Sequence, residues 1–122
     1  MNGVMENILL INSHTFVVNI IRLYKSLSEN HIEQTLPRQL LKSGTSIGAL
    51  VREAQHTESR SDFVHKLGIA QKECDETIDW LEVLNETDDL TDDQFIPLKK
   101  DAESLLKILK SSILTAKKNM QK

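Results

Sequence analysis

The sequence predicts an all-α protein that folds as an antiparallel up-down four-helix bundle. Its apolar residues are aliphatic, with 17 Leu, 11 Ile and 6 Val against 5 aromatic residues in a chain of 122. They recur at spacings of three and four, the period of one helix face, and no strand-like alternation bounded by turns competes. Four helices joined by short loops form an antiparallel bundle, and the length predicts a single domain over residues 1–122.

The first helix is predicted over residues 13–30, with Ser13 or Asn12 as its N-cap. Its apolar positions repeat at i, i+3, i+4 and i+7: Phe16, Val17, Ile20, Ile21, Leu23, Tyr24 and Leu27. Residues 1–12 are expected to form a short N-terminal arm, in which only the apolar run 8–11 could be extended.

The second helix is predicted over residues 37–56, because Pro37 suits a first helical turn. Its apolar residues are Leu40, Leu41, Ile47, Leu50, Val51 and Ala54, interrupted by many small residues. Glycine destabilises a helix interior by about 1 kcal/mol relative to alanine. Gly44 and Gly48 lie one turn apart, so another backbone can approach there. We predict close helix packing at these glycines rather than a phosphate loop, since the order of a P-loop is absent.

The third helix is predicted over residues 60–87, with Ser59 or Ser61 as its N-cap. Its seam alternates spacings of four and three: Phe63, Leu67, Ala70, Cys74, Thr77, Leu81 and Leu84. A second apolar set, Ile69, Trp80 and Val83, falls on another side. This set predicts an interface in a homo-oligomer, with intramolecular packing as the alternative for Trp80.

The fourth helix is predicted over residues 92–118, after a capping box formed by Thr91 and Gln94. Its inner face is predicted to carry Leu98, Ala102, Leu105, Leu109 and Ile113. The tail over residues 119–122 is expected to be frayed.

Charge is distributed unevenly around a net charge of −3. Residues 59–90 hold three basic and nine acidic side chains, whereas residues 91–122 hold seven lysines and four acids. A group of lysines is the candidate nucleic-acid contact: Lys99, Lys100, Lys107, Lys110, Lys117 and Lys118. These lysines either meet phosphates or pair with acids of the third helix, namely Asp75, Asp79, Glu82 and Glu86. Pairing is the commoner fate of a charge run.

Sequence motifs for catalysis or metal binding are weak. Glu53–His56 and Asp62–His65 each resemble half of a di-iron constellation, but both flank a loop instead of lying in mid-bundle. We therefore expect no metal, no cofactor and no enzymatic activity. Cys74 lies on an inner seam and is expected to be a small buried hydrophobe.

Glu53 is predicted to be a structural polar tie between the second and third helices. Its neighbours Leu50, Val51 and Ala54 are apolar, so its carboxylate is expected to be partly buried and to need a partner. Arg52, His56 or a serine of the third helix could supply one.

Localisation follows from what the sequence lacks. The longest apolar run is too short for a membrane span, and the single cysteine allows no internal disulfide. The chain is expected to be cytoplasmic, with no membrane partner.

The stretch "LLKSGTSIGALVREAQHTESRSDFVHKLGIAQKECDETIDWLEVL", residues 40–84, resembles the bacterial four-helix-bundle proteins of the 23S rRNA intervening-sequence family. These proteins carry a "SIGANIxE" stretch, then a Ser-x-x-acid-Phe helix start and an Ile-Ala pair. The matching residues are Ser46, Ile47, Gly48, Ala49, Glu53, Ser59, Asp62, Phe63, Ile69 and Ala70. One departure is Leu50, where the family usually has Asn.

The resemblance implies an up-down bundle that assembles as a homopentamer and has no enzymatic activity. It also implies nucleic acid as a partner, because a related protein is the nucleic-acid-binding accessory variability protein of diversity-generating retroelements. We therefore expect a non-enzymatic oligomeric scaffold that binds RNA weakly. The alternatives are a protein-interaction module, whose acidic third helix recruits a basic partner, and a metal-binding bundle.

Overall fold

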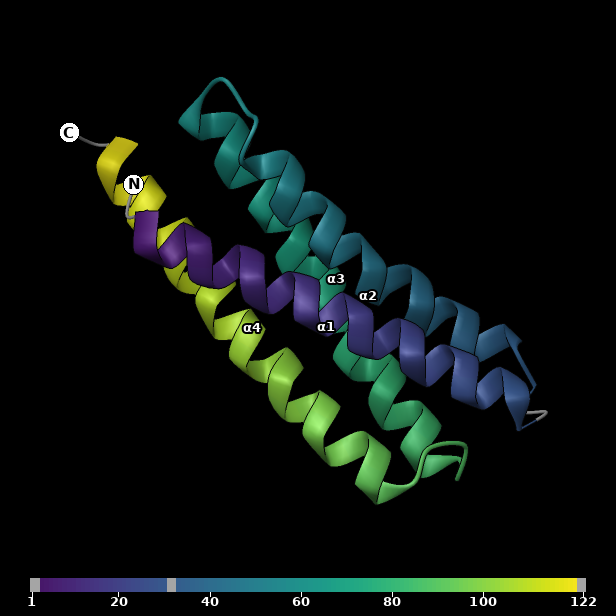
Figure 1. Ribbon diagram of the computed structural model, residues 1–122. Coiled ribbons are helices and arrows are strands. Elements are labelled where there is room, and N and C mark those ends of the chain that lie inside the picture. The colour runs from purple at the N-terminus through teal and green to yellow at the C-terminus, as the bar shows by residue number, and fades with distance from the viewer. Residues whose placement is uncertain (1–2, 31–32, 121–122) are drawn as a thin grey trace.

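The computed structural model describes residues 3–30 and 33–120, which form four helices: α1 (Gly3–Glu29), α2 (Thr35–Ala54), α3 (Arg60–Glu86) and α4 (Asp92–Met120). Each helix runs antiparallel to the next, and α1 closes the bundle by packing on α4 as well as on α2 (Figure 1). The start of α1 and the end of α4 lie at the same end of the bundle. The predicted four-helix bundle is confirmed. No helix in the described ranges is long and apolar enough to cross a bilayer.

The core runs along the middle of the bundle and takes side chains from all four helices. All seven residues of the predicted α3 seam are buried, which confirms that seam. On α4, Leu98, Ala102, Leu105 and Leu109 are buried as expected, whereas Ile113 is only half-buried. The inner face of α4 continues instead through the small residues Ser112 and Ala116, which are buried.

Side-chain hydrogen bonds cap the N-termini of α3 and α4 at the predicted residues. The Ser59 hydroxyl accepts a hydrogen bond from the Asp62 backbone N–H at 3.1 Å, so Ser59 is the N-cap of α3. Thr91 and Gln94 form the reciprocal capping box before α4. The Thr91 N–H donates to Gln94 Oε1 at 3.0 Å, and the Gln94 N–H donates to the Thr91 hydroxyl at 3.2 Å.

The start of α1 differs from the prediction. The segment expected to be an arm over residues 1–12 is helical from Gly3 onward, and residues 1–2 lie outside the described ranges. The buried seam of α1 continues back from Phe16 through Ser13 to Leu9, at spacings of three and four. Ser13 is therefore not an N-cap. It is buried in mid-helix, and its hydroxyl donates to the Leu10 carbonyl at 3.2 Å.

The other boundaries shift by a few residues at most. Helix α2 begins at Thr35, two residues before the expected start, and Pro37 lies in its first turn. Helix α4 runs on to Met120, so the first part of the expected frayed tail is helical, and residues 121–122 lie outside the described ranges.

Glycines on α2 stand where α1 comes closest. A Cβ atom placed on Gly48 would lie 2.6 Å from Val17 Cγ2, and one placed on Gly44 would lie 3.0 Å from Ile20 Cγ2. Contacts this short are below ordinary van der Waals separation, so α1 packs against the bare backbone of α2. Packing thus offsets the helix propensity lost at these glycines.

The thiol of Cys74 is part of the core. It is fully buried, and its sulfur lies 3.3 Å from the Ala102 carbonyl oxygen, to which the S–H donates. Burial, followed by the nearby negative charge of Asp75, raises the pKa of the thiol to about 12. The reactive thiolate is therefore suppressed at neutral pH.

Gly48→Ala and Gly68→Ala should change stability in opposite directions. A Cβ on Gly68 meets no atom within 4 Å, so alanine there should raise the free energy of unfolding by about 0.5–1 kcal/mol. At Gly48 the same change forces the stiff Val17 side chain aside, and overpacking of this kind costs about 1–3 kcal/mol. Urea denaturation should therefore show Gly48→Ala to be less stable than wild type. Adding Val17→Ala should reduce that loss, and a Gly48→Ala protein as stable as Gly68→Ala would contradict the close packing.

Cys74 should resist thiol reagents while the bundle is folded. We expect a disulfide reagent such as 5,5′-dithiobis(2-nitrobenzoate) to modify the native protein at pH 8 at least a hundredfold more slowly than the urea-unfolded protein. Both the exclusion of the reagent and the raised thiol pKa slow the native reaction. Equal native and unfolded rates, followed by absorbance, would show that Cys74 is accessible.

Candidate nucleic-acid interface

The lysine face of α4 consists of Lys99, Lys100, Lys107, Lys110, Lys117 and Lys118. At 3.6 residues per turn, these six positions fall within an arc of roughly 100°, on the side of α4 away from its buried residues. From Lys100 to Lys118 the helix rises about 27 Å. The sequence therefore places a long row of cationic side chains along one outer face of the bundle.

One lysine of this face is paired. Lys99 Nζ lies 3.2 Å from Glu82 Oε1 on α3 and 5.6 Å from the centroid of the Phe95 ring. The side chains of Lys99 and Glu82 are 34% and 42% exposed, so their ion pair is worth less than about 1 kcal/mol. For this lysine the pairing interpretation is correct.

The other five lysines remain available. Lys100, Lys107, Lys110, Lys117 and Lys118 are exposed, and within the described ranges none lies within 4.0 Å of a carboxylate. Their expected partners Asp75, Asp79 and Glu86 are exposed as well. The acidic face of α3 thus leaves most of the lysine face without direct ion pairs.

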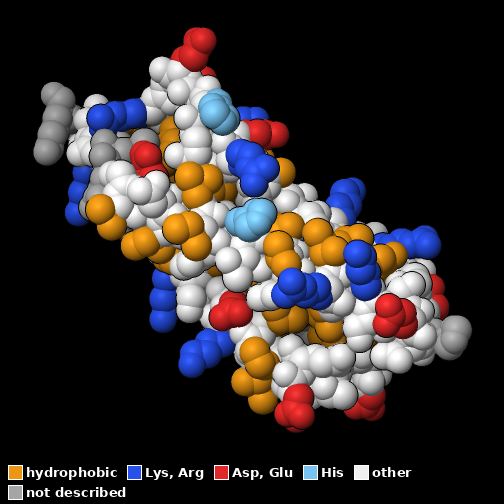
Figure 2. Space-filling model, viewed as in Figure 1, with side chains coloured by type: hydrophobic (Ala, Val, Ile, Leu, Met, Phe, Trp, Pro, Cys, Tyr) orange, Lys and Arg blue, Asp and Glu red, His pale blue; other side chains and the backbone are white. Residues whose placement is uncertain are grey.

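The lysine face is not uniformly charged. Ile96 and Leu114 are 59% and 56% exposed and, by helical position, fall within the same arc, together with Glu103. Figure 2 shows basic side chains projecting from the edge of the molecule along which α4 runs. A long row of exposed lysines suits an extended polyanion better than a small ligand.

The predicted interface residues on α3 are less exposed than expected. Ile69, Trp80 and Val83 are all half-buried, and Trp80 packs against the core. Intramolecular packing, the alternative considered for Trp80, therefore buries part of the apolar set formed by Ile69, Trp80 and Val83.

The larger exposed apolar surface is on α1. Val4, Ile8 and Ile11, here called the α1 apolar patch, are 67%, 44% and 63% exposed. Figure 2 shows hydrophobic side chains gathered over this part of α1. The sequence interpretation missed this patch because it treated residues 1–12 as an arm. Val4, Ile8 and Ile11 are separated by four and then three residues, and this spacing was the signal that could have revealed a helix face.

Glu53 links α2 to α3, but not in the expected way. Its carboxylate lies 3.1 Å from Lys66 Nζ, and its side chain is 56% exposed. The expected partial burial is therefore wrong, and the partner is Lys66 instead of Arg52, His56 or a serine. An exposed pair of this kind stabilises the corner by less than about 1 kcal/mol.

Of the weak metal motifs, Glu53–His56 lies at the end of α2 and in the turn after it, and Asp62–His65 lies at the start of α3. In the described parts of the chain, no group of three or more His, Cys, Asp or Glu side chains is arranged to hold a metal ion. Leu50, at the position where the resembled proteins have Asn, is half-buried and packs against the core.

Comparisons with known proteins agree with this architecture. A crystal structure of a protein of unknown function from the S23 ribosomal protein family of Bacteroides thetaiotaomicron VPI-5482 is 42% identical in sequence, with a TM-score of 0.87. The match covers 89% of this chain and 97% of that chain. No curated protein matches. A family profile described as "23S rRNA-intervening sequence protein" matches residues 5–111. This match covers most of the chain, which therefore belongs to the 23S rRNA-intervening sequence protein family.

Proposed function

We propose that this protein is a non-enzymatic scaffold that assembles with copies of itself and binds structured RNA weakly through the lysine face of α4. The observation that carries this proposal is the set of five exposed lysines that lack carboxylate partners within 4.0 Å in the described ranges. The family description, which refers to an intervening sequence of 23S rRNA, supports RNA as the kind of partner.

The chemistry of the face predicts how RNA would bind. Lysine ammonium groups bind phosphate oxygens as flexible point charges, and such contacts carry no sequence information. The chain has only five aromatic residues, so little stacking of unpaired bases is expected. Binding should therefore depend on RNA shape and charge and should weaken steeply as salt rises.

Self-assembly would strengthen RNA binding by the lysine face, which binds weakly in a single copy. The α1 apolar patch supplies exposed Val4, Ile8 and Ile11, which a lone bundle leaves in water. Burying that patch between copies would repeat the lysine face around the assembly and raise avidity for a long RNA. A homopentamer is the assembly that the sequence resemblance implies, and we propose it here.

The exposed acids of α3 favour a second candidate function. Asp75, Glu76 and Asp79 lie on an exposed face that could recruit a basic protein. Affinity purification from the native cell, with and without ribonuclease, would separate the two candidates. Partners that disappear with ribonuclease support RNA binding, and partners that persist support a protein-interaction module.

Reversing two charges of the lysine face should weaken RNA binding. We expect Lys107→Glu/Lys110→Glu to lower the affinity for a structured RNA fragment at least tenfold at low salt, because two attractive lysine–phosphate interactions become repulsive. It should also reduce the slope of log affinity against log salt by about 1 for each phosphate that is no longer neutralised. Fluorescence anisotropy over a range of salt concentrations measures both quantities.

The matched control is Lys25→Glu/Lys72→Glu, which alters two exposed lysines on α1 and α3 and changes the net charge equally. If this control loses as much affinity as the α4 variant, net charge and not the lysine face governs binding. Absence of wild-type binding at low salt would reject the RNA proposal.

Charges placed in the α1 apolar patch should dissociate the assembly. Multi-angle light scattering of the wild type should give a multiple of the 13.9 kDa chain mass, five for a pentamer. Ile8→Glu/Ile11→Glu should shift the mass to that of one chain, because burying an unpaired carboxylate opposes association. Ile96→Glu, at an exposed isoleucine of α4, is the control that should leave the assembly intact. A wild-type monomer at micromolar concentration would exclude self-assembly, and dissociation only by Ile69→Glu would move the interface to α3.

A further inference from the structure

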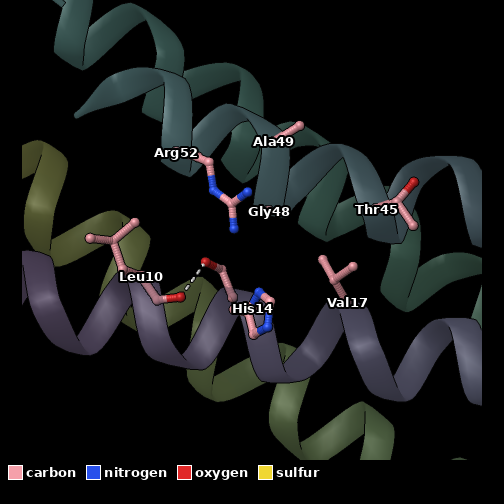
Figure 3. Close-up of a pocket in the computed structure, with 8 residues that line it drawn as sticks. Leu10, His14, Val17, Thr45, Gly48, Ala49 and Arg52 are labelled. Carbon is pink, nitrogen blue, oxygen red and sulfur yellow. Dashed lines mark hydrogen bonds between the residues drawn. The ribbon is translucent and has the colours of Figure 1, made fainter. Parts of the chain in front are cut away.

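A cleft of about 270 Å³ opens between α1 and α2, directly over the glycine at which the two helices come closest (Figure 3). Gly48 forms part of its wall, beside Val17, whose Cγ2 atom would lie 2.6 Å from a Cβ atom placed on Gly48. Aliphatic groups of Leu10, Val17 and Ala49 also line the cleft. The volume is slightly below the range of about 300–1,000 Å³ typical of drug-sized ligands, so the cleft suits a smaller molecule.

Arg52 supplies the positive charge in this cleft. Figure 3 shows Arg52 extending from α2 toward α1, and His14 lying on the α1 side of the same opening. No acidic residue lines the cleft, and within the described ranges no carboxylate lies within 4.0 Å of Arg52. Glu6 belongs to a separate hollow nearer the α2–α3 loop. Among the described residues, the Arg52 guanidinium is thus an exposed cation without a carboxylate partner, next to an apolar surface.

The hydroxyl groups of the cleft are already engaged. The Ser13 hydroxyl donates to the Leu10 carbonyl at 3.2 Å, and the Thr45 hydroxyl donates to the Leu41 carbonyl at 2.8 Å. Neither proton is therefore offered to a ligand. Polar recognition in the cleft depends on Arg52 and His14.

We propose that the cleft between α1 and α2 binds a small aliphatic carboxylate. Arginine presents a planar fork of N–H groups that matches a carboxylate in two parallel hydrogen bonds. One permanent cation balances one negative charge, whereas a phosphate dianion needs more donors than this cleft supplies. A short hydrocarbon chain would contact Leu10, Val17 and Ala49 and lose its exposure to water. This site lies on α1 and α2, whereas RNA is proposed to bind on α4, so either proposal can fail without the other.

Pentanoate is a suitable probe, and methyl NMR reports on it directly. In full-length protein with labelled Leu and Val methyl groups, sodium pentanoate should produce saturable shifts in the signals of Leu10 and Val17. The signal of Leu98, buried on α4, should stay unchanged. Arg52→Gln should raise the apparent Kd at least tenfold, because the charge-assisted hydrogen bonds are removed. Ala49→Leu should abolish the shifts by filling the cleft while leaving its charge intact.

The matched control is Arg38→Gln, which removes an exposed arginine on the same helix but outside the cleft and should bind pentanoate like the wild type. Ala49 is itself exposed, and an unchanged Leu98 signal would show that Ala49→Leu still folds. If that variant unfolds, Arg52→Gln alone decides the question. The proposal is overturned if pentanamide or inorganic phosphate produces the same shifts, if sodium chloride at equal ionic strength does so, or if Arg52→Gln binds as tightly as the wild type.

Discussion

The contact between α1 and the glycines of α2 is the constraint on which the rest of this bundle depends. At Gly48 and Gly44 the side chains of Val17 and Ile20 occupy space that any Cβ atom would claim. That contact fixes the distance between α1 and α2. On its other side, α2 meets α3, where the Ser43 and Thr77 hydroxyls lie 3.0 Å apart and share a buried hydrogen bond. Small residues on α2 therefore set its distances to both α1 and α3. Because the core is close-packed, a change in the size of these residues shifts the neighbouring helices as well.

The same contact shapes the outer surface. Because α1 lies close to α2 along the glycines, the side chains that flank them form the walls of a cleft with Arg52 at its opening. On α4, the buried side consists of Leu98, Ala102, Leu105, Leu109, Ser112 and Ala116. The long lysine side chains are left on the outer side. The proposed RNA-binding surface and the proposed carboxylate site are thus both products of how the core is packed.

Acidic and basic side chains are concentrated on two different, neighbouring helices. Acids gather on α3 and lysines on α4, and one ion pair, between Lys99 and Glu82, joins the two faces among the residues described. The remaining charges are exposed, and exposed pairs contribute little to stability. Their arrangement therefore matters more for what the surface attracts than for how the bundle folds. Long-range attraction of this kind is screened beyond about 10 Å at 0.1 M salt, so it acts mainly on partners that come close.

The sequence by itself determined the helices, their buried seams and two of their caps. These features depend on local rules: the α3 seam follows from helical periodicity, and Ser59 and Thr91 cap helices through hydrogen bonds that span three residues. Only the tertiary structure decided which charged and apolar groups remain exposed. Lys99 is paired because Glu82 of α3 comes within reach, whereas Lys107 has no such partner in the described ranges. Glu53 is exposed despite its apolar neighbours in sequence, because those neighbours face the core and it faces Lys66. The spacing of Val4, Ile8 and Ile11 already indicated a helix face, but only the packing of the bundle decided that Leu9 is buried and that these three residues are exposed. Exposure depends on contacts between residues far apart in the chain, and the pattern of a single segment does not contain them.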